Sequence, residues 1–120
     1  MRISEVAAKS GLSIDTIRYY EKSGLCPPIA RGRDGTRQFT AENAEWLALL
    51  SSLRDTGMPT KDMRHFAGLY QTGDATIPER KHLLLEHSRR LDARHKTINQ
   101  CKALLAHKLA RYDRILGQSS

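Results

Sequence analysis

The chain has 120 residues, and its 20 Lys and Arg against 13 Asp and Glu give a formal net charge of +7. This length fits one modest domain with an appended helix, and a chain this small buries more apolar surface as a dimer. The positive charge is typical of proteins with a polyanionic partner. The sequence shows no long apolar stretch and no N-terminal signal region, so we expect a cytoplasmic protein with no membrane partner.

The charge is unevenly distributed. Residues 1–40 hold seven Lys and Arg and four Asp and Glu, residues 41–75 hold three and five, and residues 76–120 hold ten and four. The middle is therefore a poor surface for a polyanion, and the two ends are the candidates.

The first 24 residues predict two short helices joined by a tight turn. Ser4 is expected to cap the first helix and Gly11 to end it, because glycine adopts a left-handed backbone without steric cost. Ser13 then caps a second helix that ends at Gly24. Thr16 is turned away from the interior, so this helix can present polar side chains to a partner. The pattern is that of a DNA-reading helix-turn-helix.

An arginine-rich hairpin is predicted to follow. Pro27 and Pro28 favour extended backbone, and Asp34-Gly35 is a turn dipeptide between two candidate strands, 29–31 and 36–39. The hairpin carries three arginines against one acid: Arg31, Arg33 and Arg37 against Asp34. Arginines in this setting reach phosphates or the minor groove, so the sequence predicts a wing.

Two more helices are predicted in the middle of the chain. Thr40 caps the first of them, and Gly57 is expected to end it. Its apolar stripe is wide, which indicates burial on more than one side; the stripe contains Ala44, Trp46, Leu47, Leu49, Leu50 and Leu53. Pro59-Thr60 introduces the next helix, and Gly73 is expected to stop it.

The most regular pattern is an apolar residue at every seventh position from Ile77. The row comprises Ile77, Leu84, Leu91, Ile98, Leu105 and Tyr112, on a helix predicted from Pro78 to about Leu116. Such a helix is roughly 55–60 Å long at 1.5 Å per residue. A narrow seam flanked by basic residues favours a two-stranded coiled coil. The alternative is a single amphipathic helix packed on its own head.

Four segments together resemble the MerR family of bacterial transcription regulators. They are IRYYEKSGL at 17–25, the Pro27-Pro28 pair, RQF at 37–39 and LRDTGMPTKDMR at 53–64. The resemblance implies an all-α fold with a small β-hairpin wing, in which a winged helix-turn-helix DNA-binding domain (1–74) precedes a dimerisation helix (75–120). That helix would form an antiparallel coiled coil in a homodimer.

The resemblance also implies a function. A MerR-like dimer binds a near-palindromic promoter element in double-stranded DNA and, on receiving a signal, distorts it so that RNA polymerase can use an overlong spacer. RNA polymerase would thus be an indirect partner. The alternative from a different class is an inducer-independent DNA-bending or adaptor protein with the same fold. We expect that the protein is not an enzyme, since no catalytic set of cysteine, histidine and carboxylate is concentrated on one element.

The expected DNA contacts follow from these placements. Ser13 and Thr16 lie near the leading end of the second helix, where Thr16 can meet a base edge. Arg18 and Tyr19 are expected at phosphates. The alternative that Tyr20 faces DNA stays open, although Tyr20 follows Ile17 by three residues on the inward side. The remaining expected contacts are Arg31, Arg33 and Arg37 in the wing and Lys61, for which an ordinary solvated lysine is the alternative.

The signal is not evident from the residues. The aldehyde-responsive branch that this chain resembles keeps a reactive cysteine where Ser52 stands here, and a hydroxyl cannot replace that thiol at neutral pH. Cys26 lies near several arginines that could lower its pKa, so it is a possible sensing thiol; a packed loop residue is the alternative. Cys101 is expected to be a small buried apolar residue. The histidines lack i,i+4 pairing, so we expect no metal site and no cofactor.

Overall fold

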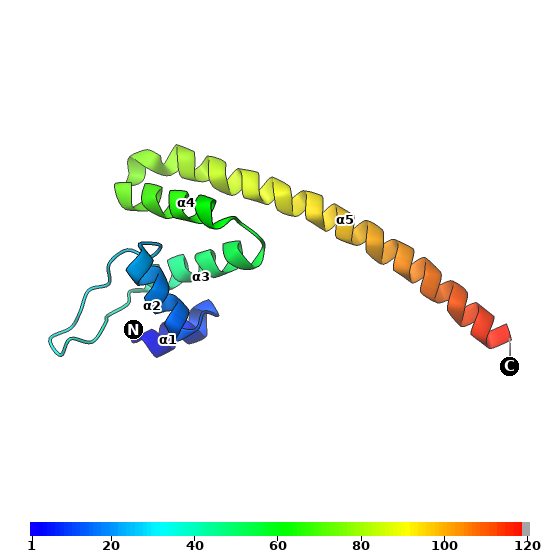
Figure 1. Cartoon of the computed structure of the whole chain (residues 1–120), viewed down its shortest axis with the longest axis horizontal. Helices are drawn as coiled ribbons and strands as arrows, with labels where there is room; N and C mark the ends of the chain where they lie inside the picture. The colour runs from blue at the N-terminus through cyan, green and yellow to red at the C-terminus, as the bar shows by residue number, and fades with distance from the viewer. Residues whose placement is uncertain (119–120) are drawn as a thin grey trace. The chain divides into compact units, whose positions relative to one another are not determined.

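The computed structural model describes residues 1–118, which form five α-helices and one short 3-10 helix within that range. Figure 1 shows them in chain order. They are α1 (Ile3–Ser10), α2 (Ile14–Ser23), α3 (Ala41–Asp55), α4 (Thr60–Thr72), η1 (Asp74–Thr76) and α5 (Ile77–Gln118). The chain divides into two compact units, Met1–Leu84, here called the head, and a second that begins at Leu85.

The helix ends in the head follow mostly from local signals. Ser13 Oγ accepts a hydrogen bond of 3.1 Å from the backbone N–H of Thr16, and Gly24 ends α2 with φ 83°. Thr40 and Asn43 form a reciprocal capping box at the start of α3. These caps supply partners for backbone donors that a helix start leaves unbonded.

One expected cap is wrong. Helix α1 begins at Ile3, so Ser4 lies inside its first turn, and Arg2 occupies the N-cap position without a side-chain cap. The cap position needs extended backbone, and it is Arg2 that has it, with φ −80° and ψ 159°. Ser4 cannot cap a helix to which it already belongs.

One apolar core joins helices α1 to α4. Its members are Val6, Leu12, Ile17, Tyr20, Leu25, Cys26, Ile29, Phe39, Ala44, Trp46, Leu47, Leu50, Leu53, Met58, Met63, Phe66 and Ala67. Full burial of one large apolar side chain contributes about 1.5–3 kcal/mol. Helix α3 supplies residues on several sides, as the wide stripe predicted, and so it is the central element of the head.

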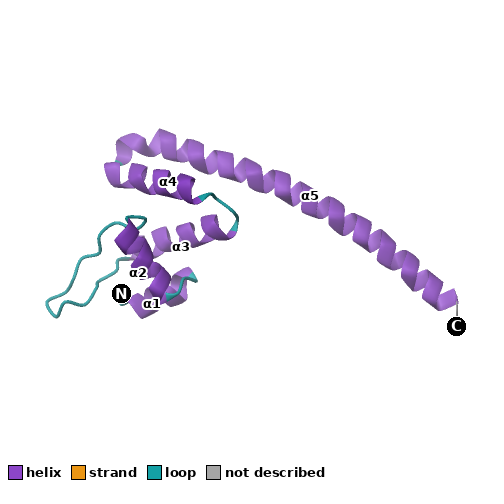
Figure 2. Ribbon diagram, viewed as in Figure 1, coloured by secondary structure: helices purple, strands orange, loops and turns teal. Residues whose placement is uncertain are grey.

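The segment between α2 and α3, residues 25–39 and here called the wing loop, differs from the prediction. Neither expected strand is present among residues 1–118, and Figure 2 shows this segment entirely as loop. One isolated antiparallel bridge pairs Arg31 with Arg37. Two short backbone bonds flank it, from Gly32 N to Thr36 O and from Gln38 N to Ala30 O, each 2.8 Å. Two-stranded pairing is marginal in isolation, and the preceding prolines have no N–H to extend it.

Helix α5 is continuous over 42 residues and includes the whole range predicted from Pro78 to Leu116. Its first turns, to Leu84, belong to the head. Within residues 1–118 no helix has the length and apolar character that would let it cross a membrane.

Candidate nucleic-acid interface

The leading end of α2 carries two hydroxyl groups that bond to each other. Ser13 Oγ lies 2.8 Å from Thr16 Oγ1 and also caps the helix. Ser13 is exposed and Thr16 is half-buried. A base edge that bonds to Thr16 would therefore meet a hydroxyl whose position is already fixed by the cap.

The two adjacent tyrosines of α2 point in opposite directions with respect to the core. Tyr20 is 5% exposed and Tyr19 is 54% exposed. The orientation expected from the spacing to Ile17 is confirmed, because Ile17 is fully buried on the same side. Tyr19 and its neighbour Arg18 together form an exposed polar surface. Arg18 forms an ion pair with Asp15 at 4.0 Å.

The three arginines of the wing loop have different environments. Arg31 is exposed and donates to the Gly35 carbonyl at 2.9 Å. Arg33 is also exposed. Arg37 instead donates through Nε to Glu21 Oε2 at 2.7 Å, and the two side chains are 27% and 18% exposed. Arg37 thus ties the wing loop to α2.

Glu21 is a partner of the wing loop that the sequence did not predict. It is the acid that receives Arg37, yet it stands 16 positions earlier in the chain. No periodicity joins two such residues. The available signal was a lone acid in the last turn of α2, opposite the polar face, close to an arginine-rich loop.

The turn at the tip of the wing loop is fixed by Asp34. Its carboxylate accepts a 3.0 Å bond from the Thr36 backbone N–H. Hydrogen bonding from Thr36 holds the pKa of this carboxyl below its usual range. The charged form favours the bond that closes the tip from Asp34 to Thr36.

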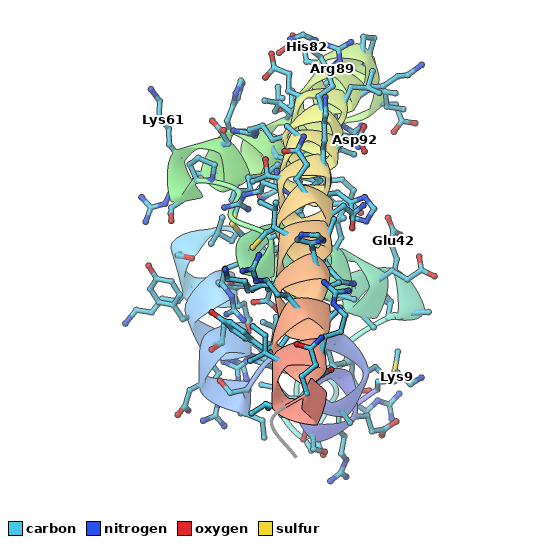
Figure 3. The ribbon with its side chains drawn as sticks, turned by 90° about the vertical axis from the view of Figure 1, so that its right-hand side faces the viewer. Lys9, Glu42, Lys61, His82, Arg89 and Asp92 are labelled. Carbon is cyan, nitrogen blue, oxygen red and sulfur yellow. The ribbon has the colours of Figure 1, made fainter. Side chains whose placement is uncertain are left out.

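Lys61 lies in the first turn of α4 and is exposed. Figure 3 shows it extending away from the helix, on the opposite side of the view from Glu42. A phosphate near this helix start would meet both the ammonium group and the backbone N–H groups that point out of the first turn.

The environment of Cys26 contradicts the reasoning that made it a sensing thiol. Its side chain is 1% exposed. Burial, with a smaller contribution from the Glu21 charge, raises its pKa from 9.0 to about 12. The expected lowering by nearby arginines is wrong, because the acid and the apolar core, not guanidinium groups, surround the sulfur. Cys101 was expected to be buried and is exposed in this chain.

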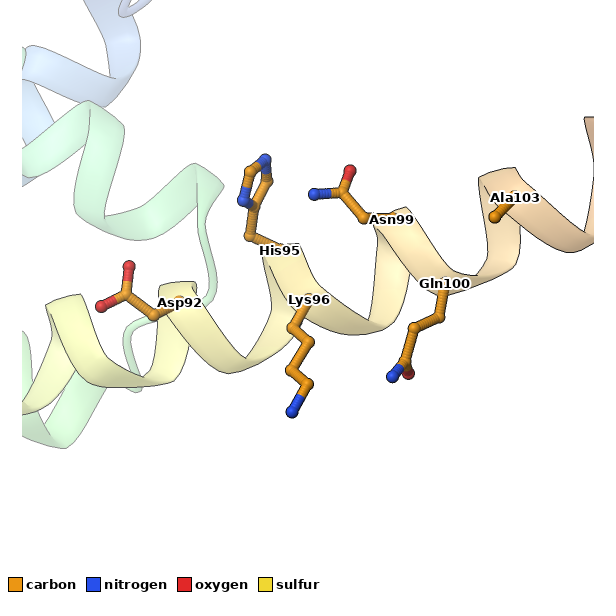
Figure 4. A pocket seen from close by; sticks show the side chains of 6 residues that line it. All are labelled: Asp92, His95, Lys96, Asn99, Gln100 and Ala103. Atoms are coloured by element: carbon orange, nitrogen blue, oxygen red, sulfur yellow. The ribbon is translucent and has the colours of Figure 1, made fainter.

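No group of three or more His, Cys, Asp or Glu that could hold a metal ion occurs within residues 1–118. An open hollow of about 590 Å³ lies along α5 and is lined by Asp92, His95, Lys96, Asn99, Gln100 and Ala103. Figure 4 shows that Lys96 and Gln100 point to the opposite side of the helix from His95 and Asn99. Side chains that diverge from one helix do not converge on a ligand.

Most of the seventh-position row of α5 is exposed. Ile98 is 57% and Leu105 56% exposed, while Leu84 and Leu91 are half-buried. Tyr112 of the same row is also exposed, and further exposed apolar side chains lie near it toward the end of the helix: Leu109, Ile115 and Leu116. A contiguous apolar surface of this kind is typical of an interaction site.

Comparison with known proteins connects these features to one family. Residues 1–67 match the family model described as MerR HTH family regulatory protein. An uncharacterized HTH-type transcriptional regulator of Haemophilus influenzae is 37% identical over 92% of this chain and 82% of its own length. The regulator AdhR of Bacillus subtilis is 34% identical over 76% of this chain and 65% of its own length.

A solved structure gives the same result. It is that of HiNmlR, described as a MerR family regulator lacking the sensor domain and bound to promoter DNA. The TM-score is 0.84 at 35% identity, over 99% of this chain and 94% of that one. Because the family model matches more than half of the chain and the head has the helix-turn-helix, this chain belongs to the MerR family of helix-turn-helix transcriptional regulators.

Proposed function

We propose that this MerR-type regulator binds a near-palindromic promoter element as a homodimer and distorts it in response to a signal. The observation that carries the proposal is the surface formed by α2 and the wing loop. Its arginines and Tyr19 are presented on elements that Arg37 and Glu21 tie together at 2.7 Å. The promoter-bound state of HiNmlR supports duplex DNA as the partner.

Each contact has a distinct part in this proposal. Thr16 meets a base edge in the major groove, with Ser13 beside it. Arg18 and Tyr19 bind the phosphate backbone, while Arg31 and Arg33 bind phosphates from the wing loop and Lys61 binds a further phosphate at the start of α4. Arg37 contacts the DNA backbone through its terminal guanidinium nitrogens, since its Nε is bonded to Glu21.

Dimerisation is proposed to use the apolar row of α5. We place the DNA-binding domain at residues 1–74 and the dimerisation helix at 75–120, with the boundary in η1 between α4 and α5. Leu84, Leu91, Ile98, Leu105 and Tyr112 would form the seam of an antiparallel coiled coil. The two recognition helices then read half-sites at a separation set by that coiled coil. RNA polymerase would respond to the DNA distortion without being a direct ligand.

A footprint on the DNA that flanks the gene tests the proposal. We expect protection of two half-sites by the dimer, with enhanced cleavage at the centre where the DNA is distorted. Binding must weaken steeply as salt rises, because phosphate contacts release counterions. Equal, salt-insensitive affinity for every duplex would contradict the proposal.

One observation favours a second candidate, an inducer-independent DNA-bending protein. With a pKa of about 12, the Cys26 thiol is protonated at neutral pH and is a poor trap for electrophiles. Gel mobility of operator fragments with the site at different positions reports the bend. An identical bend with and without aldehydes, oxidants and metal ions favours this candidate, and a bend that changes with one of them favours the regulated form.

A further inference from the structure

The corner at which the chain leaves α2 for the wing loop is held by side chains from two other helices. Trp46 Nε1 of α3 donates a 2.8 Å bond to the Leu25 carbonyl, and the bond is buried. Gln71 Nε2 of α4 donates a 2.8 Å bond to the neighbouring Gly24 carbonyl. Two successive carbonyls at one turn are therefore bonded from outside the turn.

The indole that makes the first bond is itself fixed by stacking. Trp46 lies 4.2 Å from Tyr70 and 5.1 Å from Phe66 between ring centroids, with interplanar angles of 19° and 18°. The Tyr70 hydroxyl donates to Glu42 of α3. Parallel rings at these distances gain stacking energy beyond their burial.

Arg80, from the first turns of α5, adds to this column of stacked side chains on the Tyr70 side. The Arg80 guanidinium carbon lies 5.4 Å from the centroid of the Tyr70 ring. Arg80 also donates to Thr76 Oγ1 at 3.0 Å and to the Gly73 carbonyl at 3.2 Å. The start of α5, α4 and α3 thus meet the α2 corner through one column of side chains, all within the head.

The wing loop itself has little internal structure to set its direction. Its one bridge and two prolines leave it dependent on external contacts. They include the Trp46 and Gln71 bonds and the bond from the Cys26 N–H to the Tyr20 carbonyl at its start. Near its end they include the Glu21–Arg37 pair and the two bonds between Met1 and Phe39. A loop that has to be ordered on binding loses affinity through the entropy of ordering.

We propose that Trp46 and Gln71, with the indole steadied by Tyr70 and Arg80, are positioning residues that hold the wing arginines at the DNA phosphates without touching DNA. The inference rests on the proposed function. Trp46 is only 6% exposed, so a direct DNA contact is not its role. Loss of its bond to Leu25 lets the wing loop move and removes phosphate contacts that Arg31 and Arg33 would make.

The salt dependence of binding separates positioning from stability. A variant that is partly unfolded has fewer active molecules, but each of them keeps the same number of phosphate contacts. The slope of log affinity against log salt counts those contacts at about 0.9 per phosphate on duplex DNA. A mispositioned wing loop lowers the slope, and simple destabilisation does not.

The experiment compares full-length wild type, Trp46→Phe and Gln71→Leu on a duplex selected by the wild type from a random 40-bp library. Phenylalanine keeps a stacking ring and removes the indole donor, and Gln71→Leu tests the same corner from an exposed position. The matched control is Thr72→Ala, also exposed on α4, whose hydroxyl donates to the Gly68 carbonyl of its own helix. We expect both test variants to lose slope by roughly one or two phosphate contacts and the control to keep the wild-type slope.

A double-mutant cycle with Arg31→Ala completes the test. If the corner acts through the wing loop, Arg31→Ala costs less affinity in the Trp46→Phe background than in wild type. Unchanged slopes with fully additive losses overturn the inference while the proposed function stands. Wild type that binds no duplex in a salt-dependent manner overturns both.

Discussion

Arg18 is an exposed cation of α2 that contributes little to the stability of the fold. Its ion pair with Asp15 spans 4.0 Å with both side chains largely exposed, and such pairs contribute about 0–1 kcal/mol. Arg18→Ala should therefore leave the melting temperature nearly unchanged, weaken binding to all duplexes and reduce the salt slope by about one. Lys22→Ala in the last turn of the same helix is the control. Unchanged affinity in Arg18→Ala would remove this residue from the interface.

Cys26 gives a residue-scale prediction with a defined pH dependence. The folded protein holds the thiol proton up to a pKa of about 12, whereas an exposed thiol in the unfolded chain releases it near 9.0. Deprotonation above pH 9 thus favours the unfolded state, at about 1.4 kcal/mol per pH unit until the folded pKa is reached. The stability difference between wild type and Cys26→Ala should therefore shrink as pH rises from 9 to 11 in chemical denaturation. A difference that stays constant with pH would contradict the raised pKa.

The same burial predicts how the two thiols react. At pH 8 a disulfide reagent should modify exposed Cys101 rapidly and Cys26 only after the head opens. Mass spectrometry of the labelled protein assigns each site. Rapid labelling of Cys26 in the folded protein would restore it as a sensing thiol.

At the scale of single elements, the end of α2 is set by the backbone of one residue. Gly24 has φ +83° and open space around the position of an added Cβ, so an alanine there meets backbone strain alone. Gly24→Ala should cost about 1–2 kcal/mol in unfolding free energy. Gly68, inside α4, also has open space but no positive φ, so Gly68→Ala should stabilise the protein by up to about 1 kcal/mol. Urea denaturation measures both changes in unfolding free energy. We expect opposite signs for the two substitutions, and equal signs would contradict the role of the positive φ at Gly24.

The elements that the sequence predicted well are those with signals at their own ends. Ser13, Gly24 and Thr40 each act on backbone groups within three residues, and the helices begin and end there. The wing strands were wrong because pairing depends on contacts across the loop, and a turn dipeptide reports only its own geometry. The Trp46 bond to Leu25 joins residues 21 apart. Sequence patterning gave Trp46 as a core residue and carried no information about which carbonyl it would meet.

At the scale of the whole molecule, the exposed row of α5 makes a dimer the expected state. Charged substitutions at Leu91 and Ile98 together place charges in the proposed seam, where they lose hydration without a partner. We expect Leu91→Glu with Ile98→Glu to sediment as a monomer while the head keeps its fold. Ala93→Glu with Gln100→Glu, at exposed positions of α5 outside the row, is the matched control. A dimer that persists in the first variant would contradict the seam.

The charge of α5 opposes the dimer that its apolar row favours. Residues 85–118 carry eight Lys and Arg and only three Asp and Glu, whereas residues 1–84 carry twelve and ten, so most of the net charge belongs to the helix and not to the head. Two copies paired along this helix bring their like charges close together. At 0.1 M salt, charges that lie within the screening length of about 10 Å still repel one another.

Salt should therefore act in opposite directions on the two assemblies. Raising NaCl from 50 to 500 mM is expected to strengthen dimerisation by screening that repulsion, and to weaken DNA binding by counterion competition. Sedimentation equilibrium and duplex titration on the same samples measure the two effects separately. Lys102→Glu with Lys108→Glu should reduce the salt dependence of dimerisation, because opposite charges then stand along the same helix. A dimer that weakens with salt in the wild type would mean that ion pairs, and not the apolar row, hold the two helices together.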